Sequence, residues 1–237
     1  MNLLMKKITC LICARGGSKG LKNKNIKKFH GKHLIEWTFK VAKSIDKFSN
    51  IILSTDSKKI VEIAKKNRIE VPFLRPKNLA KDNSKELNVW KHALKYLKKI
   101  DKFPDILVIL PVTSPLRKKE HINQAIKKFE KSKSDALITI KESDRNPYFN
   151  MVKLNKNRHA QIVNNKNKSF ARRQDAPKVY SMSTICFIFK PKFILKTNNI
   201  FNGKVSTILF HKKYSVDIDD NYDFVIAETL FKKKISI

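Results

Sequence analysis

The chain has 237 residues, with 52 Lys and Arg against 20 Asp and Glu, and a formal net charge of +32. A hydrophobic content of 41% and 15 Phe indicate a globular protein with a sizeable core and exclude a disordered chain. No apolar run approaches the roughly 18 residues that a membrane-spanning helix needs, so we expect no membrane insertion. The apolar N-terminal stretch runs straight into a glycine-rich loop, which favours a strand over a signal peptide and predicts a cytoplasmic protein.

The strong positive charge raises the possibility of a nucleic-acid partner. Only eight of the 52 cations are Arg, however, and the other 44 are Lys. Proteins that read bases depend on Arg for bidentate contacts, and grooves for single strands interleave aromatic side chains with the cations. Neither pattern is present, so we expect a solvated Lys-rich surface and no nucleic-acid partner. A non-catalytic polyanion-binding protein is kept as an alternative from a different functional class.

The first 142 residues alternate apolar runs of strand length with amphipathic segments of helical spacing. Strands are predicted over residues 8–14, 50–56, 69–75, 105–111 and 135–142. Helices are predicted over residues 33–45, 57–67, 84–99 and 118–132, with Ser57 and Ser84 as N-caps. This order predicts an α/β fold with a mostly parallel, twisted sheet and helices on both of its faces.

The alternation breaks at about residues 143–180, where short alternating pieces and many Asn predict a hairpin-like arm inserted into a single domain, 1–237. A strand is expected over 181–190, short strands within 205–218, and a closing helix over 221–233. Asp220 and Asp223 are interpreted as the N-cap and a first-turn acid of that helix.

The three cysteines are interpreted as buried apolar residues. Cys10 and Cys13 form a C-x-x-C within a predicted strand. Because residues three apart on a strand point to opposite faces, this pair cannot share a metal ion or close a disulfide there.

Residues 14–25, ARGGSKGLKNKN, hold three of the five glycines and four cations immediately after the first strand. Glycine permits close backbone approach, and cations beside such a loop indicate a bound anion. The loop matches neither the P-loop nor the G-x-G-x-x-G pattern. Three other segments lie at or directly after the ends of predicted strands: Thr55 and Asp56, Arg75, and residues 111–117. Since ligands bind beyond the carboxyl ends of parallel strands, these segments predict one site at that edge.

These motifs resemble those of the acylneuraminate cytidylyltransferase family, which acts on sialic, legionaminic, pseudaminic and 3-deoxy-octulosonic acids. The first loop carries most of the resemblance, and TSPLR (113–117), RRQ (172–174) and DIDD (217–220) follow in the family's order. The resemblance implies a Rossmann-like nucleotidyltransferase fold and a homodimer whose inserted arm reaches the neighbour's site. It also implies transfer of CMP from CTP to the anomeric hydroxyl of a keto sugar acid, with release of pyrophosphate.

The resemblance also implies roles for individual residues. The expected nucleotide-binding residues are Ala14, Arg15, Gly16, Gly17, Ser18, Lys19, Lys24, Asn25, Arg75 and Ser84. The expected sugar-binding residues are Pro111, Thr113, Ser114, Arg173, Gln174 and Ser183. The expected catalytic residues are Arg15, Lys24, Asp217 and Asp219.

Asp217 and Asp219 are two residues apart in a predicted strand, so both carboxylates are expected on one face. Two such charges repel each other, and a Mg²⁺ ion between them and the phosphates would turn that cost into attraction. One of the two, or a metal-bound water, is expected to deprotonate the sugar hydroxyl.

The sequence departs from the family on the sugar side. Family members commonly have Gln-Pro before TSPLR, where this chain has Pro111 and Val112. Many have Asn-Gly-Ala in the late strand, where this chain has Ser183, Thr184 and Ile185. The expected substrate is a nine-carbon acid used for a bacterial surface glycan. The eight-carbon 3-deoxy-octulosonate enzyme is the close alternative, although that relative usually carries a different first loop.

Overall fold

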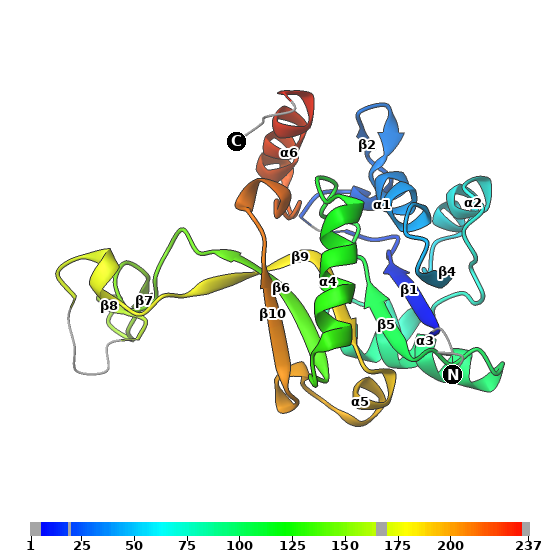
Figure 1. Cartoon of the computed structure of the whole chain (residues 1–237). Coiled ribbons are helices and arrows are strands. Elements are labelled where there is room, and N and C mark those ends of the chain that lie inside the picture. The colour runs from blue at the N-terminus through cyan, green and yellow to red at the C-terminus, as the bar shows by residue number, and fades with distance from the viewer. Residues whose placement is uncertain (1–5, 19, 165–169, 234–237) are drawn as a thin grey trace.

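A six-stranded sheet forms the centre of the computed structural model, which describes residues 6–18, 20–164 and 170–233 (Figure 1). Its strands are β1 (Ile8–Cys13), β4 (Phe48–Ser54), β5 (Ile106–Ile109), β6 (Ala136–Glu142), β9 (Tyr180–Phe189) and β10 (Val205–Leu209), in the order β10-β6-β9-β5-β1-β4. Only β9 runs antiparallel to its neighbours, β5 and β6, among these six strands. The predicted mostly parallel sheet is confirmed.

Helices cover both faces of this sheet, as the alternating pattern predicted. One face packs against α1 (Leu34–Lys43), α2 (Lys58–Lys66), α4 (Lys119–Lys131) and α6 (Asn221–Lys233). The other face packs against α3 (Glu86–Lys99) and α5 (Pro191–Lys196). A two-stranded ribbon, β2 (Lys28–Phe29) and β3 (Lys32–His33), precedes α1. Within the described residues, no helix combines the length and the apolar character needed to cross a membrane.

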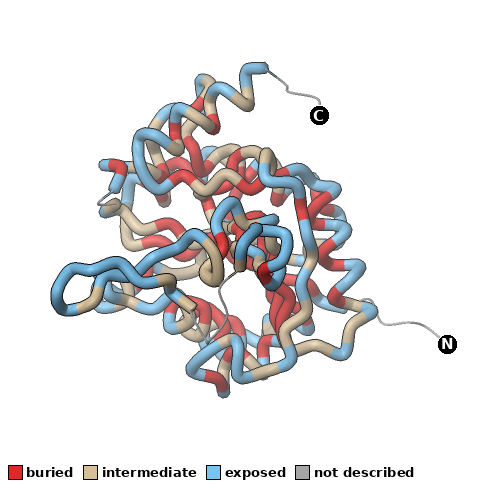
Figure 2. The backbone as a smooth tube through the Cα atoms, turned by 90° about the vertical axis from the view of Figure 1, so that its left-hand side faces the viewer, coloured by how far each residue is buried: buried red, intermediate tan, exposed pale blue. Residues whose placement is uncertain are grey.

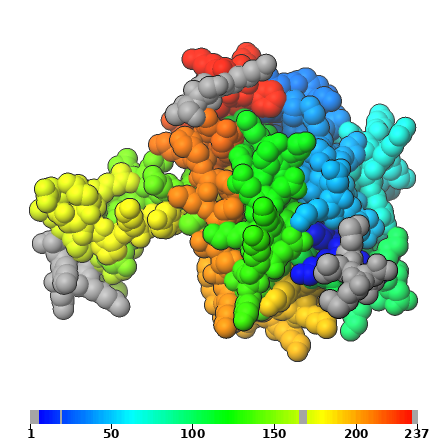
Figure 3. All heavy atoms as spheres, viewed as in Figure 1, coloured from blue at the N-terminus to red at the C-terminus, as the bar shows by residue number. Residues whose placement is uncertain are grey.

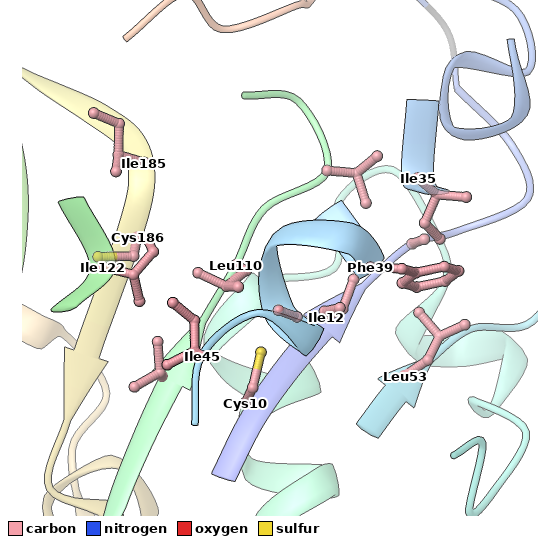
Figure 4. Close-up of a cluster of buried hydrophobic side chains, with 14 of the residues drawn as sticks. Cys10, Ile12, Ile35, Phe39, Ile45, Leu53, Leu110, Ile122, Ile185 and Cys186 are labelled. Carbon is pink, nitrogen blue, oxygen red and sulfur yellow. The ribbon is translucent and has the colours of Figure 1, made fainter. Parts of the chain in front are cut away.

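Strand β1 is buried on both faces, which explains its continuous apolar sequence. Cys10 belongs to the same core layer as Phe39 and Leu53 (Figure 4), whereas Cys13 packs against the opposite layer. Burial raises the pKa of the Cys13 thiol to about 12, so this thiol stays protonated at neutral pH. All three cysteines are free, and Cys10 and Cys186 are buried as predicted, whereas Cys13 is half-buried.

The helix ends agree with the sequence patterns at two of three predicted caps. Ser57 accepts a hydrogen bond from the Ile60 backbone N–H at 3.4 Å and caps α2. The Asp223 N–H donates to Asp220 Oδ1 at 3.0 Å, which confirms the predicted start of α6. The predicted Ser84 cap is wrong, because α3 begins one residue later and the Ser84 hydroxyl donates instead to the Asn78 carbonyl at 2.7 Å.

Two predicted strands are also wrong. Residues 69–75 form only isolated bridges, from Glu70 to Ile52 of β4 and from Leu74 to Thr55 just after β4. Pro72 between them lacks the N–H that a ladder needs. In the late region β10 ends at Leu209, and a 3₁₀ turn over Lys212–Tyr214 follows. Asp217 and Asp219 therefore lie in an irregular segment, and their expected common strand face does not exist.

Residues 143–179 leave the body of the molecule between β6 and β9 (Figure 1). This arm contains the predicted hairpin, formed by β7 (Val152–Leu154) and β8 (Ala160–Ile162). Its backbone is mostly exposed or half-buried (Figure 2), and it stands clear of the body in the space-filling view (Figure 3). The large apolar side chains exposed on the arm and its strand roots are Met151, Val152, Leu154, Val163, Tyr180 and Met182.

Candidate active site

A cleft of about 420 Å³ opens at the carboxyl edge of β1 and β5, where the sequence predicted a site. It brings together eight of the expected site residues: Arg15, Ser18, Lys24, Asn25, Arg75, Ser84, Thr113 and Asp219. The other lining residues are Cys13, Gly20, Leu79, Lys81, Asp82, Glu86, Val89 and Trp90.

The glycine-rich loop is shaped by close backbone contacts. A Cβ atom on Gly20 would lie 2.5 Å from the Asp219 carbonyl oxygen, so only glycine allows this loop to approach the acidic segment. The Gly16 N–H donates to Asp56 Oδ1 at 2.9 Å, and Asn25 Nδ2 donates to the Arg15 carbonyl at 2.9 Å. These bonds fix the loop backbone at Gly16 and Arg15.

The remaining residues of the loop are placed differently from one another. Ala14 is buried and its N–H donates to the Ser54 carbonyl at 3.1 Å, so it offers little besides backbone. Gly17 is exposed, and a Cβ atom added there would meet nothing within 4 Å. The expected phosphate contact from Lys19 lies outside the described residues.

Lys24 connects the loop to the late acidic segment. Its ammonium group donates to the Ile218 carbonyl at 2.6 Å and to Asp219 Oδ1 at 2.9 Å. The Lys24 side chain is 14% exposed, whereas that of Asp219 is 76% exposed. A partly buried cation is thereby fixed beside a carboxylate that water and ligands can reach.

Two arginines line the cleft, and they differ in burial and in hydrogen-bond partners. Arg75 is buried, and its guanidinium donates to the Ser54 carbonyl at 2.6 Å and to the Ser54 hydroxyl at 3.0 Å. Arg15 is half-buried and forms an ion pair with Asp82. Arg75 is thus held by the end of β4, while Arg15 is held by a side chain on a loop.

Asp217 is the more buried member of the acidic pair. Burial raises the pKa of its carboxyl group, the charge of Asp219 raises it further, and hydrogen bonds with Thr113 and Thr184 oppose the shift. Asp217 Oδ1 is buried and has no hydrogen-bond partner among the described residues. The two carboxylates are therefore electrostatically coupled despite the loss of the predicted strand.

Residues 111–117 form a rigid support behind the cleft. The guanidinium of Arg117 is buried and donates to the carbonyls of Pro111, Ser114 and Ile185. Burial lowers the pKa of Arg117 to about 10, so the group remains charged at neutral pH. Thr113 lies at the cleft surface, where its carbonyl accepts from the Ile218 N–H at 2.9 Å.

The other expected sugar-binding residues lie elsewhere. The hydroxyls of Ser114 and Ser183 belong to buried residues and face Thr184 and Thr139, at 2.5 Å and 2.8 Å. Arg173 and Gln174 lie on the arm, in a separate hollow of about 330 Å³ that also includes Tyr180. Of the expected sugar-binding residues, Thr113 thus lines the cleft with the expected nucleotide groups, whereas Arg173 and Gln174 lie in the separate hollow.

Eight cleft residues were missed by the sequence analysis, and Asp82, Glu86 and Trp90 are among them. Glu86 and Trp90 are four residues apart on α3, so they share a helix face, and this spacing was available in the sequence. Asp82 lies in an irregular segment, where no periodicity reveals which way a side chain points.

The sheet order and the cleft define an α/β nucleotidyltransferase fold. The solved structure of a CMP:2-keto-3-deoxy-manno-octonic acid synthetase complexed with CTP superimposes with a TM-score of 0.70 over 97% of this chain and 100% of that chain. Sequence identity is 12%, so this likeness concerns the fold. A family model described as cytidylyltransferase matches residues 9–235, and the chain belongs to this family.

Curated relatives narrow the position within the family. The chain is 37% identical over 231 residues to post-translational flagellin modification protein B of Campylobacter coli, covering 97% of both chains. It is 36% identical over 233 residues to the CMP-N,N'-diacetyllegionaminic acid synthase of Campylobacter jejuni, again covering 97% of both chains. The resemblance to the branch that acts on nine-carbon acids is confirmed.

Proposed function

We propose that this enzyme transfers CMP from CTP to the anomeric hydroxyl of a nine-carbon keto sugar acid, with release of pyrophosphate. The acid is of the legionaminic, pseudaminic or sialic type, and the product serves cell-surface glycan synthesis. The observation that carries the proposal is the meeting of the glycine-rich loop, Lys24 and Asp219 at one cleft, with the half-buried Asp217 in electrostatic contact with Asp219 and Lys24. The names of the relatives and the family membership support the nucleotide and the sugar class.

The loop and its cations bind the triphosphate in this proposal. The Gly17 backbone N–H and the side chains of Arg15, Lys24 and Asn25 would surround the phosphate oxygens, and Gly16, whose N–H donates to Asp56, would bring the backbone close to them. Transfer from a nucleoside triphosphate depends mainly on positioning and on stabilising the charge that develops at the attacked phosphorus. Arg15 would exchange its ion pair with Asp82 for a phosphate oxygen when CTP binds.

Asp217 and Asp219 fit a Mg²⁺ ion. Asp217 Oδ1 is a buried carboxylate oxygen without a hydrogen-bond partner among the described residues, and Asp219 is exposed to the cleft. Among those residues, no cluster of three or more His, Cys, Asp or Glu has the geometry of a metal site. Two carboxylates suit Mg²⁺ when substrate phosphates complete its coordination. When bound, the ion would neutralise phosphate charge and orient the reacting group.

The attacking sugar hydroxyl must also lose a proton. Asp217 and Asp219 are the two carboxylates that interact with Lys24. One of these two carboxylates would take this proton.

We further propose that the sugar site is completed in a cytoplasmic homodimer. Arg173 and Gln174 lie on the arm, away from the cleft of their own chain, and the arm exposes several large apolar side chains. A second copy that covers these side chains would bring its Arg173 to the carboxylate of the bound sugar acid. Pro111 and Thr113 would contact the sugar directly, while Ser114 and Ser183 would shape its pocket from behind. No nucleic acid takes part.

The test is pyrophosphate release from CTP and Mg²⁺ with four acceptors: N,N'-diacetyllegionaminic, pseudaminic, N-acetylneuraminic and 3-deoxy-octulosonic acids. We expect turnover with a nine-carbon acid and a CMP-sugar product by mass spectrometry. Turnover with the eight-carbon acid alone would establish the alternative enzyme. Absence of turnover with every acceptor, together with tight binding of polyanions, would favour the non-catalytic alternative.

A further inference from the structure

One wall of the cleft has no role in the mechanism above. It consists of Leu79, Glu86, Val89 and Trp90, from α3 and the segment before it, and it adjoins Arg75. It contains a carboxylate and two buried apolar side chains, whereas the glycine-rich loop offers backbone N–H groups and cations. The two walls therefore suit different parts of a nucleotide.

Charge decides which part of the nucleotide lies against α3. Glu86 keeps accessible surface in the cleft, and its carboxylate would repel a triphosphate placed beside it. Desolvation in the cleft raises the pKa of Glu86, the charge of Asp217 raises it further, and Arg75 opposes the shift. A hydrogen-bond donor without negative charge is the partner that this carboxylate requires.

The apolar part of the wall is suited to a flat ring. Val89 and Trp90 are 4% and 5% exposed, and the Trp90 ring packs against Phe189 with 5.0 Å between the ring centroids. Such a backing keeps the Trp90 ring fixed at the wall of the cleft. Trp90 Nε1 has no hydrogen-bond partner among the described residues, so the wall also holds an unused donor.

We propose that Glu86 determines nucleotide specificity by accepting a hydrogen bond from the 4-amino group of the cytosine base. This inference rests on the proposed function and identifies the residue that makes the enzyme select CTP over UTP. Carboxylates accept from this amino group in nucleic-acid recognition, whereas uracil has a carbonyl oxygen at the same position. UTP would place that oxygen against the Glu86 carboxylate, leaving two acceptors without a proton between them.

The test measures kcat/KM for CTP and for UTP with the preferred sugar acid in four proteins: the natural enzyme, Glu86→Gln, Glu86→Ala and Glu62→Gln. Glutamine keeps the volume of Glu86 and can turn its amide to donate to uracil. Glu62 is an exposed carboxylate on α2 and serves as the matched control. We expect the CTP-to-UTP ratio to fall about 10- to 100-fold in both Glu86 variants and to stay unchanged in Glu62→Gln.

Glu86 also lies in the first turn of α3, where an acid stabilises the helix through its dipole. A purely structural role would lower kcat/KM for both nucleotides equally and leave the ratio intact, which would overturn the inference. An unchanged ratio with full activity would overturn it too. In either case the natural enzyme would still turn over CTP, so the proposed function would stand. Only the absence of CTP turnover in the natural enzyme would refute the function itself.

Discussion

The cleft is built from short segments that brace one another, whereas the arm is a long excursion held mainly at its base. In the cleft, Lys24 bonds to the segment around Asp219, and Arg117 supports residues 111–117 from the core. On the arm, Leu154 is 61% exposed and Val152 is 58% exposed. The side chains of the cleft find their partners within one chain. The arm exposes apolar side chains that its own chain does not cover.

This difference separates the two halves of the proposed reaction. Most of the side chains proposed for the nucleotide line one cleft, so we expect CTP binding to require little reorganisation beyond the Arg15–Asp82 ion pair. Arg173, proposed for the sugar, lies on the arm outside that cleft. We therefore expect variants in the cleft to act within each chain and variants in the arm to act between chains.

The largest expected effect comes from the acidic pair. Asp217→Asn and Asp219→Asn should each lower kcat about 10³-fold, because each removes a charge proposed to hold Mg²⁺ against the phosphates. Pyrophosphate release under saturating CTP and sugar measures the effect, and circular dichroism checks the fold. Asp46→Asn, an exposed residue between α1 and β4, is the matched control. Near-normal Mg²⁺-dependent turnover in both variants would contradict the assignment.

A mixture of two variants tests the division between cleft and arm directly. Lys24→Ala should lose about 10²-fold in kcat/KM by removing a cation from the phosphates, and Arg173→Ala a similar factor by weakening sugar binding. Random pairing of the two variants makes about half of the dimers heterodimers. If the arm completes the partner's site, each heterodimer has one intact site of its two, so the mixture should recover about a quarter of normal activity. Sites built within single chains would give no recovery on mixing.

The contrast between cleft and arm also explains what the sequence could predict. The strand β1 and the amphipathic helices could be predicted because burial sets the spacing of their apolar residues. The mostly parallel sheet followed from the alternation of strands and helices. Ser57 and Asp220 were found as caps because capping is a local interaction. Residues 69–75 were misread as a strand because their apolar content outweighed Pro72 in the pattern.

The cleft was predictable in position and less so in detail. Loops after parallel strands meet at one edge whatever their sequence, so the gathering of Arg15, Lys24 and Thr113 followed from topology. The approach of Gly20 to Asp219 depends on tertiary packing between segments about 200 residues apart, and no local pattern encodes it. The arm extends from the paired strands β6 and β9. Its residues are mostly exposed or half-buried, so their sequence has no periodic burial pattern from which the course of the arm could be predicted.

A more moderate effect is expected from the apolar surface of the arm. Leu154→Glu should shift the protein toward monomer and lower turnover about 10-fold, because burying an unpaired carboxylate in an interface is unfavourable. Light scattering after size exclusion measures the oligomeric state. Lys153→Glu also adds a carboxylate to β7, but on the opposite face of the strand, and should leave both quantities nearly unchanged. Equal behaviour of the two variants would argue against an interface at Leu154.

The smallest expected effect is a gain in stability from the loss of a cleft carboxylate. The pKa of Asp217 is raised by burial and by Asp219, so the folded protein binds this proton more tightly than the unfolded chain does. Ionisation at neutral pH therefore costs stability, and Asp217→Asn should stabilise the Mg²⁺-free protein by about 0.5–1 kcal/mol.

The sign of the pH dependence follows from the same shift. Below the ordinary pKa of Asp, both folded and unfolded chains carry the proton, and the advantage of Asp217→Asn should disappear. Thermal melts of both proteins without Mg²⁺, from pH 7 down to pH 4, measure the narrowing difference. A variant less stable than the natural enzyme at pH 7 would mean that the Asp217 carboxylate contributes to the fold. In that case the ionised Asp217 would stabilise the folded cleft, and the charge at the site would not lower the stability of the protein.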